Sequence, residues 1–169
     1  MLFRFQKIKT HRSVIILAST IILLIMEWIG TISFATSGAL VAIRHGLDLF
    51  GVVTVGAITA VGGGIMRDVM IGNVPPKIFS NPFVLIAAVV TSIIVFLIAY
   101  LFRKKFDKLS ENIDSFNILF DALGLAAFSI TGIEVACLAS LRGNVVLVII
   151  MGVVTGVGGG VLRDVLVNE

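Results

Sequence analysis

Long apolar runs alternate with short polar segments along this chain of 169 residues. The hydrocarbon core of a bilayer is about 30 Å thick, and about 20 consecutive apolar residues in a helix are needed to cross it. The polar segments are short, and several are rich in Gly, Asn or Pro, which favour turns. The pattern predicts an all-α integral membrane protein with five spans, at residues 14–43, 49–66 (running on to 71), 83–102, 120–141 and 145–162.

The first apolar run is too long for one upright span. Its 30 residues are broken only by Glu27 and would form about 45 Å of helix, which is too little for two crossings. We therefore expect one tilted span whose working part is 27–43. Residues 1–25 form a basic and apolar N-terminal extension that resembles a signal sequence, but no small-residue cleavage site follows it.

Composition and charge exclude several classes of protein. Only 14% of residues are charged, against about 25% in soluble domains, so the chain cannot cover a water-facing globule. The net charge of +3 does not indicate nucleic-acid binding, because the basic residues cluster at 4–12 and 103–108, beside apolar runs, as is usual next to membrane spans. We therefore expect a multi-pass protein of the inner (plasma) membrane.

Enzymatic chemistry has little support. The single Cys137 excludes an intrachain disulfide and has no partner for a cysteine-based metal site, and both histidines lie in polar segments. Three consecutive glycines occur inside a span rather than between a strand and a helix, as a phosphate-binding loop requires. We expect no catalytic residues, no metal site and no cofactor.

An eleven-residue segment at 59–69 returns at 155–165 with eight identical positions. Further matches occur at a spacing of 94: Gly30 with Gly124, Phe34 with Phe128, Ser37 with Thr131, and Gly38 with Gly132. The repeated segment lies on the second and fifth spans, so its two copies cross the membrane in opposite directions. This arrangement predicts an inverted repeat, in which 26–102 is the first three-helix unit, 103–117 a charged connecting loop and 118–169 an incomplete second unit.

Each repeated segment contains three glycines and an Arg-Asp pair. Glycine in a helix costs about 1 kcal/mol relative to alanine, so we expect the helices to break there, with the two breaks facing each other near mid-membrane. Close helix packing is the alternative. The residues expected at the breaks, beside a pore, are Gly62, Gly63, Gly64, Gly158, Gly159 and Gly160.

Charged and hydroxyl-bearing residues inside the spans are candidates for lining or gating a path. Neighbouring Arg and Asp point to different sides of a helix, so we expect Arg67 to reach Asp164 and Arg163 to reach Asp68, in a structural or gating role. Anchoring at the membrane surface is the alternative. The other candidates are Thr59, Thr155, Ser37, Thr131 and Glu134. The hydroxyls can instead bond within their own helices, and Glu27 and Asp121 lie near span ends.

The segments 30–39 and 48–51, together with the two Gly-Gly-Gly-x-x-Arg-Asp motifs, resemble the bacterial relatives of trimeric intracellular cation (TRIC) channels, which are also classified as a glycine-transporter domain family. The resemblance covers about residues 27–169. It implies seven helices in two inverted three-helix repeats plus a final helix, with helices two and five kinked at the glycines, and a homotrimer with one pore per subunit. On that pattern the chain stops before the last two helices.

Three functions remain open from the sequence. The resemblance favours a monovalent cation channel that prefers potassium. The alternative is a carrier of glycine or another small zwitterion, and the third possibility is a scaffold whose glycines only pack helices. The expected partners are other copies of the chain, membrane lipids and the transported ion or solute. When residues 1–25 are left out, five basic residues lie on the side of the membrane that holds the 103–108 loop and two lie on the other side. Because basic residues are enriched in cytoplasmic loops, this places the 103–108 loop in the cytoplasm.

Overall fold

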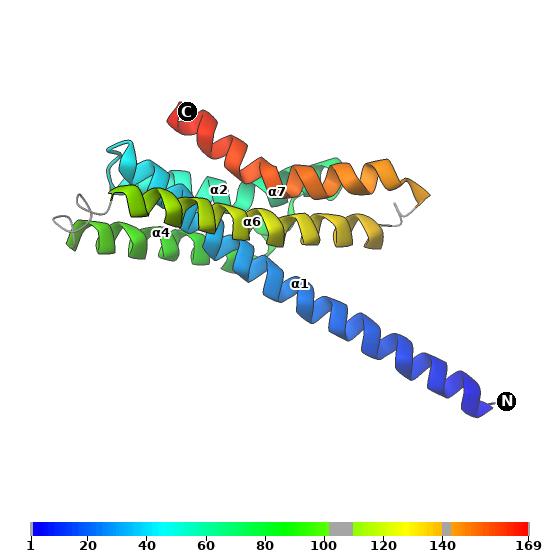
Figure 1. The fold of residues 1–169 in the computed structure, drawn as a ribbon. Helices are drawn as coiled ribbons and strands as arrows, with labels where there is room; N and C mark the ends of the chain where they lie inside the picture. Colours follow the sequence, from blue (N-terminus) through cyan, green and yellow to red (C-terminus); the bar gives the residue numbers. More distant parts are fainter. Residues whose placement is uncertain (1, 102–109, 140–142, 169) are drawn as a thin grey trace.

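The computed structural model describes residues 2–101, 110–139 and 143–168, with side chains from residue 20 onward and, in the second segment, from residue 114. This part of the chain contains helices and no strand (Figure 1). Five helices are long and apolar enough to cross a membrane, which confirms the all-α membrane architecture. The helices are α1 (Leu2–Arg44), α2 (Leu49–Met70), the short α3 (Lys77–Ser80), α4 (Phe83–Leu101), α6 (Ser110–Leu138) and α7 (Val145–Val167).

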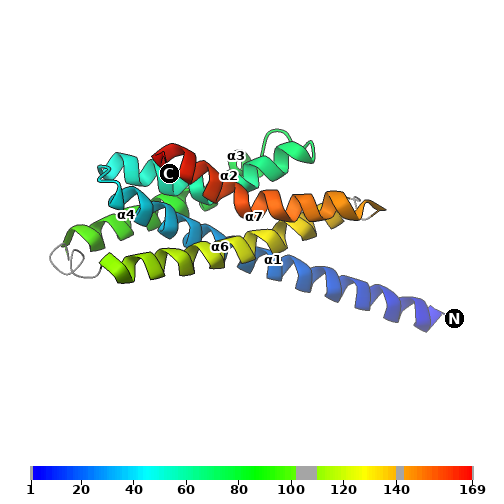
Figure 2. The ribbon, with the colours of Figure 1, turned by 45° about the horizontal axis from the view of Figure 1, so that its top comes forward.

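The first helix, α1, is continuous over 43 residues, which corresponds to about 65 Å. Its C-terminal part, Thr20–Arg44, qualifies as the membrane span. The N-terminal turns extend beyond the helix bundle in both ribbon views (Figures 1 and 2). One long first span was expected, and the structure has one.

Several helix boundaries differ from the expected ones, and two of them bear on the site. Helix α6 begins at Ser110 instead of 120, so residues 110–117 of the expected connecting loop are helical, while 102–109 lie outside the described residues. Acidic residues near this end of the helix, Glu111 and Asp114, favour a helix N-terminus. Helix α7 continues five residues past 162 to Val167, and then Asn168 ends it in the left-handed conformation (φ 61°).

Helices α2 and α7 begin with the same kind of cap. The side chain of Asp48 accepts a hydrogen bond from the Gly51 N–H at 2.8 Å, and that of Asn144 accepts one from the Leu147 N–H at 3.1 Å. Asp48 and Asn144 are 96 residues apart, the spacing of the repeated motif. The repeat therefore includes the start of each motif helix as well as its glycines.

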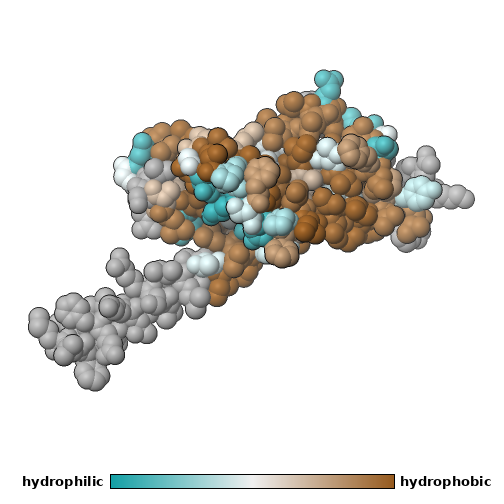
Figure 3. All heavy atoms as spheres, turned by 180° about the vertical axis from the view of Figure 1, so that it is seen from behind, coloured by the Kyte–Doolittle hydropathy of each residue, from teal (hydrophilic) through white to brown (hydrophobic). Residues whose placement is uncertain are grey.

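Four helices form the centre of the bundle. Helix α1 packs on α2 and α6, α7 also packs on α2 and α6, and α4 covers α1 and α2 (Figure 2). The pair α1 and α2 thus corresponds to the pair α6 and α7. Figure 3 shows a largely hydrophobic outer face with hydrophilic side chains gathered in a central patch, and such an apolar exterior suits contact with lipid.

Candidate functional site

The two motif helices cross at their glycines. Gly63 faces the backbone carbonyl of Thr155, and Gly159 faces the backbone carbonyl of Thr59, so closely that an added Cβ would collide with either oxygen. The two contacts are related by the repeat spacing of 96. Residues 59 and 63 lie against 159 and 155 respectively, so α2 and α7 run antiparallel here, as an inverted repeat requires.

The glycine segments are not unwound. Helices α2 and α7 are each α-helical from end to end through their glycines, and α7 bends along its length (Figure 1). In α7 the expected break thus takes the form of a bend in a continuous helix, and the close-packing alternative describes the contacts of both helices. Packing of two bare backbones offsets the low helix propensity of glycine.

Most of the candidate hydroxyls bond within their own helices. Thr59 donates to the Val55 carbonyl at 2.7 Å, Thr155 to the Met151 carbonyl at 2.6 Å, and Thr131 to the Phe128 carbonyl at 2.9 Å. Thr59 and Thr155 are fully buried. Their hydroxyl hydrogens are therefore used within the helices, and a role in lining a path stays a prediction.

Ser37 makes contacts between helices instead. Its hydroxyl donates to Oδ1 of Asn117 at 2.8 Å and accepts a hydrogen bond from Nη1 of Arg163 at 2.6 Å. Asn117 was expected in a loop, but it lies on α6 because that helix begins early. Ser37 thus joins α1, α6 and α7 at one point.

The expected cross-pairing of the motif charges is wrong. Arg67 binds the carboxylate of Asp68 through Nε at 2.9 Å and Nη2 at 2.8 Å, and Arg163 binds that of Asp164 through Nε at 2.8 Å. Each arginine therefore pairs with its own neighbour. The antiparallel crossing explains this, because residues 67 and 163 lie on opposite sides of it, roughly 18 Å apart along the helix axes.

Arg163 also makes a second ion pair, to Asp121. Its Nη1 lies 2.6 Å from Asp121 Oδ1, so this guanidinium ties α7 to α6 as well as to Ser37 on α1. At the repeat spacings, the counterparts of Arg163, Asp121 and Ser37 are Arg67, Glu27 and Thr131. An equivalent set, with Arg67 and Glu27 from the first repeat and Thr131 from the second, is therefore present on the other side of the crossing.

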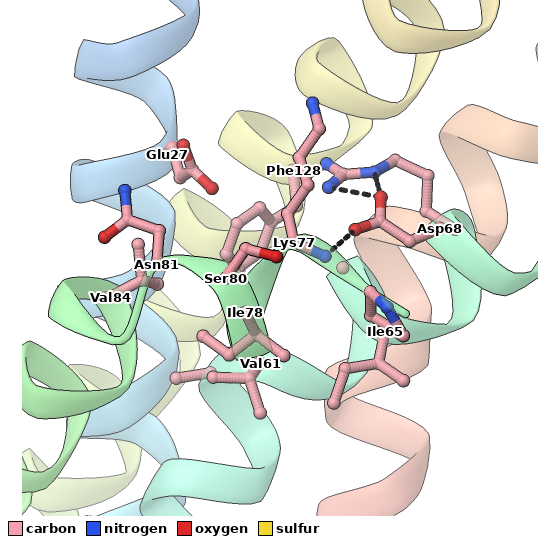
Figure 4. Close-up of a pocket in the computed structure, with 14 residues that line it drawn as sticks. Glu27, Val61, Ile65, Asp68, Lys77, Ile78, Ser80, Asn81, Val84 and Phe128 are labelled. Carbon is pink, nitrogen blue, oxygen red and sulfur yellow. Dashed lines mark hydrogen bonds and ion pairs between the residues drawn. The ribbon is translucent and has the colours of Figure 1, made fainter. Parts of the chain in front are cut away.

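Two cavities flank the crossing. The larger cavity, of about 210 Å³, is lined mainly by α2, the α3 region and Glu27 of α1, and Figure 4 shows Glu27 across it from Asp68 and Lys77. The smaller cavity, of about 110 Å³, lies beside α7. Eight of its nine lining residues have their repeat counterparts in the larger one, namely Phe34 (Phe128), Asp121 (Glu27), Gly156 (Ala60), Val157 (Val61), Gly160 (Gly64), Val161 (Ile65), Arg163 (Arg67) and Asp164 (Asp68).

The larger cavity carries charged side chains of both signs. Glu27 and Asp68 supply carboxylates, while Arg67 and Lys77 supply cations. An adjoining cavity of about 190 Å³ shares Glu27, Arg67 and Lys77 with it and adds Thr131 to the lining. Asp68 is further fixed by the backbone N–H of Lys77, which donates to its Oδ2 at 2.9 Å.

Some of these residues were not singled out from the sequence. Glu27 and Asp121 were weighed as candidates, with placement at the membrane surface at least as strongly expected because they lie near span ends. They are acidic residues one repeat spacing apart, and that match could have identified them. Lys77 lies beyond the helix-ending prolines, where no periodic signal applies. Glu134, a candidate, is half-buried on α6 and does not line these three cavities, so its role stays a prediction.

The chain is similar to membrane proteins of bacteria. The family model described as glycine transporter matches residues 24–100 and 118–169. The UPF0126 inner membrane protein YadS of Escherichia coli is 36% identical over 144 residues, which cover 85% of this chain and 65% of that protein. The chain spans 62–65% of the length of the curated relatives that it matches first.

Solved structures are similar as well. A prokaryotic TRIC channel crystallised in 0.5 M KCl superposes with a TM-score of 0.78 at 39% identity, over 89% of this chain and 72% of that one. The TRIC trimeric intracellular cation channel orthologue from Rhodobacter sphaeroides gives a TM-score of 0.72 at 34% identity, over 87% and 71%. The chain is therefore a multi-pass inner-membrane protein that belongs to the glycine-transporter family, with the UPF0126 membrane proteins and the prokaryotic TRIC channels.

Proposed function

We propose that this chain forms the conducting part of a passive channel for monovalent cations, with potassium preferred and one pore in each subunit of a homotrimer. The observation that carries the proposal is the pair of repeat-related cavities on opposite sides of the glycine crossing. A path between them would run through the centre of one subunit. The similar solved structures are named as TRIC cation channels, and this supports the choice of a cation.

The charges in the cavities suit a cation path. Each cavity holds two carboxylates, from Glu27 and Asp68 in the larger and from Asp121 and Asp164 in the smaller. Arg67 and Arg163 would repel a cation, but each is bound to a neighbouring carboxylate. A cation entering either cavity therefore meets paired arginines and carboxylate oxygens, which are ligands that alkali cations accept. In the larger cavity it also meets Lys77, whose positive charge works against entry.

The proposal is tested by recording from the purified protein in planar bilayers, with potassium on one side and sodium or choline on the other. We expect unitary currents whose reversal potential moves toward that of potassium. Mass measurement in detergent should give three copies. A protein that is trimeric and folded but carries no unitary current at any voltage would contradict the channel.

A carrier of glycine or another small zwitterion is the second candidate. The larger cavity favours it, because Glu27 lies across from Lys77 (Figure 4), and the two could hold an ammonium group and a carboxylate of one small molecule. The test is uptake of labelled glycine into proteoliposomes. Saturable uptake without unitary current would replace the channel with the carrier.

A further inference from the structure

An aromatic pair lies between the two cavities. The rings of Phe34 on α1 and Phe128 on α6 have centroids 5.3 Å apart at an interplanar angle of 40°. Phe128 lines the larger cavity and Phe34 the smaller one. Only 1% of Phe34 and 4% of Phe128 is exposed, so the pair is buried, with one ring facing each cavity.

Each ring is seated on a glycine of the opposite repeat. A Cβ added at Gly30 would lie 3.0 Å from the ring of Phe128, and one added at Gly124 would collide with the ring of Phe34. These two contacts are repeat counterparts, because both pairs of positions are separated by 94. The rings therefore occupy the pseudo-symmetry axis, where the two repeats meet.

The material around the rings is apolar. Phe34 and Phe128 belong to one buried cluster with the small side chains of Ala35, Ala60 and Ala88. The charged groups of each cavity lie beyond this cluster on either side. An apolar constriction between two cavities that carry charged side chains can stop conduction by excluding water, without any atom binding the ion.

We propose that Phe34 and Phe128 form the gate of the pore, an apolar septum that separates the two cavities and opens when the rings part. This inference rests on the proposed function, because it assigns the closed point of the same path. The rings belong to different repeats, so a displacement of α1 relative to α6 would separate them. The glycine crossing then holds α2 and α7 in place beside the gate and does not itself close the path.

The test measures water and ion passage together. Phe34→Ala, Phe128→Ala and the double variant are reconstituted in proteoliposomes, and their osmotic water permeability is followed by stopped-flow light scattering. We expect a severalfold rise for each single variant and a larger rise for the double variant, with a matching rise of current in the closed state. Phe96→Ala is the matched control, because Phe96 stacks on Tyr100 of α4 at 6.3 Å, away from both cavities, and it should leave permeability unchanged.

Two further variants at position 128 keep the test decisive if the alanine variants misfold. Phe128→Leu keeps an apolar side chain of smaller volume, and Phe128→Trp enlarges it, so permeability should follow the order alanine, leucine, wild type, tryptophan. If the alanine variants fail to give the wild-type oligomer on size-exclusion chromatography, the leucine and tryptophan variants decide. Folded variants with wild-type water permeability and current would overturn the gate.

The water measurement also separates this inference from the proposed function. If the wild type carries no ions but the alanine variants leak water, the septum is confirmed and the channel function is wrong. If the wild type conducts and the folded alanine or leucine variants are unchanged in both measurements, the channel stands and the gate lies elsewhere.

Discussion

Arg163 lies 2.6 Å from Asp121, and their ion pair joins α7 to α6 beside the smaller cavity. The equivalent residues of the first repeat, Arg67 and Glu27, line the larger cavity, where Arg67 binds Asp68. The second repeat thus has an ion pair between its helices, and among the described residues the equivalent Arg67 and Glu27 form no such pair. The cavities of about 110 Å³ and 210 Å³ share eight pairs of equivalent residues, and the larger one is also lined by residues of 76–84, which have no equivalents in the lining of the smaller.

The Arg163–Asp121 pair should contribute measurably to stability. Asp121→Asn leaves the guanidinium with Asp164 alone, and breaking a fully buried pair costs about 3–5 kcal/mol. The Asp121 side chain is 33% exposed, so we expect a smaller loss, about 1–3 kcal/mol, seen as a lower unfolding temperature in detergent.

The matched control for that change is Asp114→Asn. Asp114 pairs with Arg44 at the end of α1, where 49% and 44% of the two side chains are exposed. Exposed ion pairs contribute about 0–1 kcal/mol. Equal losses from Asp121→Asn and Asp114→Asn would show that the bond to α7 has no special role in stability.

Neighbouring glycines of one motif should differ sharply in their tolerance of a methyl group. Gly63→Ala places Cβ against the Thr155 carbonyl, and a backbone atom cannot move aside cheaply. We expect a loss of about 1–3 kcal/mol from overpacking. At Gly64 the nearest atom is Nη2 of Arg67, 3.8 Å away, so Gly64→Ala should be neutral or gain up to about 1 kcal/mol in helix propensity.

Thermal unfolding of the two variants in one detergent checks this contrast. Gly159→Ala and Gly160→Ala repeat the experiment in the second motif, where Gly159 faces the Thr59 carbonyl and Gly160 has its nearest neighbour at 3.9 Å. If all four substitutions were equally damaging, the flexibility of the glycines would matter more than their close approach.

The spans and the inverted repeat could be predicted because each produces a recognisable pattern in the sequence. Apolar length indicates a crossing, and the motif at 59–69 and 155–165 indicates two related helices three crossings apart. The side-chain pairing could not be predicted in the same way. It depends on where the helices cross, and the antiparallel crossing at the glycines sends Arg67 and Arg163 to opposite sides.

The early start of α6 also places a residue at the site that the sequence did not indicate. The charged residues of 103–117 indicated a loop, yet 110–117 are helical and bring Asn117 to Ser37. A polar helical end cannot be told from a loop by hydropathy, because its apolar contacts are few. The equivalence of Glu27 and Asp121 could have been predicted from the spacing of 94. It would have required comparing positions that hold similar residues as well as those that hold identical ones.

The carboxylate of Glu27 should raise cation conduction if the larger cavity belongs to the path. Glu27→Gln removes a charge that draws cations into the cavity, so single-channel potassium conductance should fall severalfold at low salt and less at high salt, where screening weakens the field. Glu134→Gln is the control, because Glu134 lies on α6 outside the three cavities. An equal fall in the control would restore Glu134 as a pore-lining residue.

Coupling energies from double-mutant cycles distinguish the charge pairs that the structure shows from the pairs between the two motifs that the sequence predicts. A double-mutant cycle with Arg163→Gln and Asp121→Asn should give an interaction energy of about 0.5–3 kcal/mol, because the two groups touch. A second cycle, with Arg163→Gln and Asp68→Asn, should be additive within about 0.5 kcal/mol. These residues lie on opposite sides of the crossing, and Asp68 is held by Arg67 and the Lys77 N–H. Unfolding in detergent supplies all of the free energies from one assay. Strong coupling in the second cycle and none in the first would mean that the motif charges meet across the repeats, and the crossing geometry described above would be wrong.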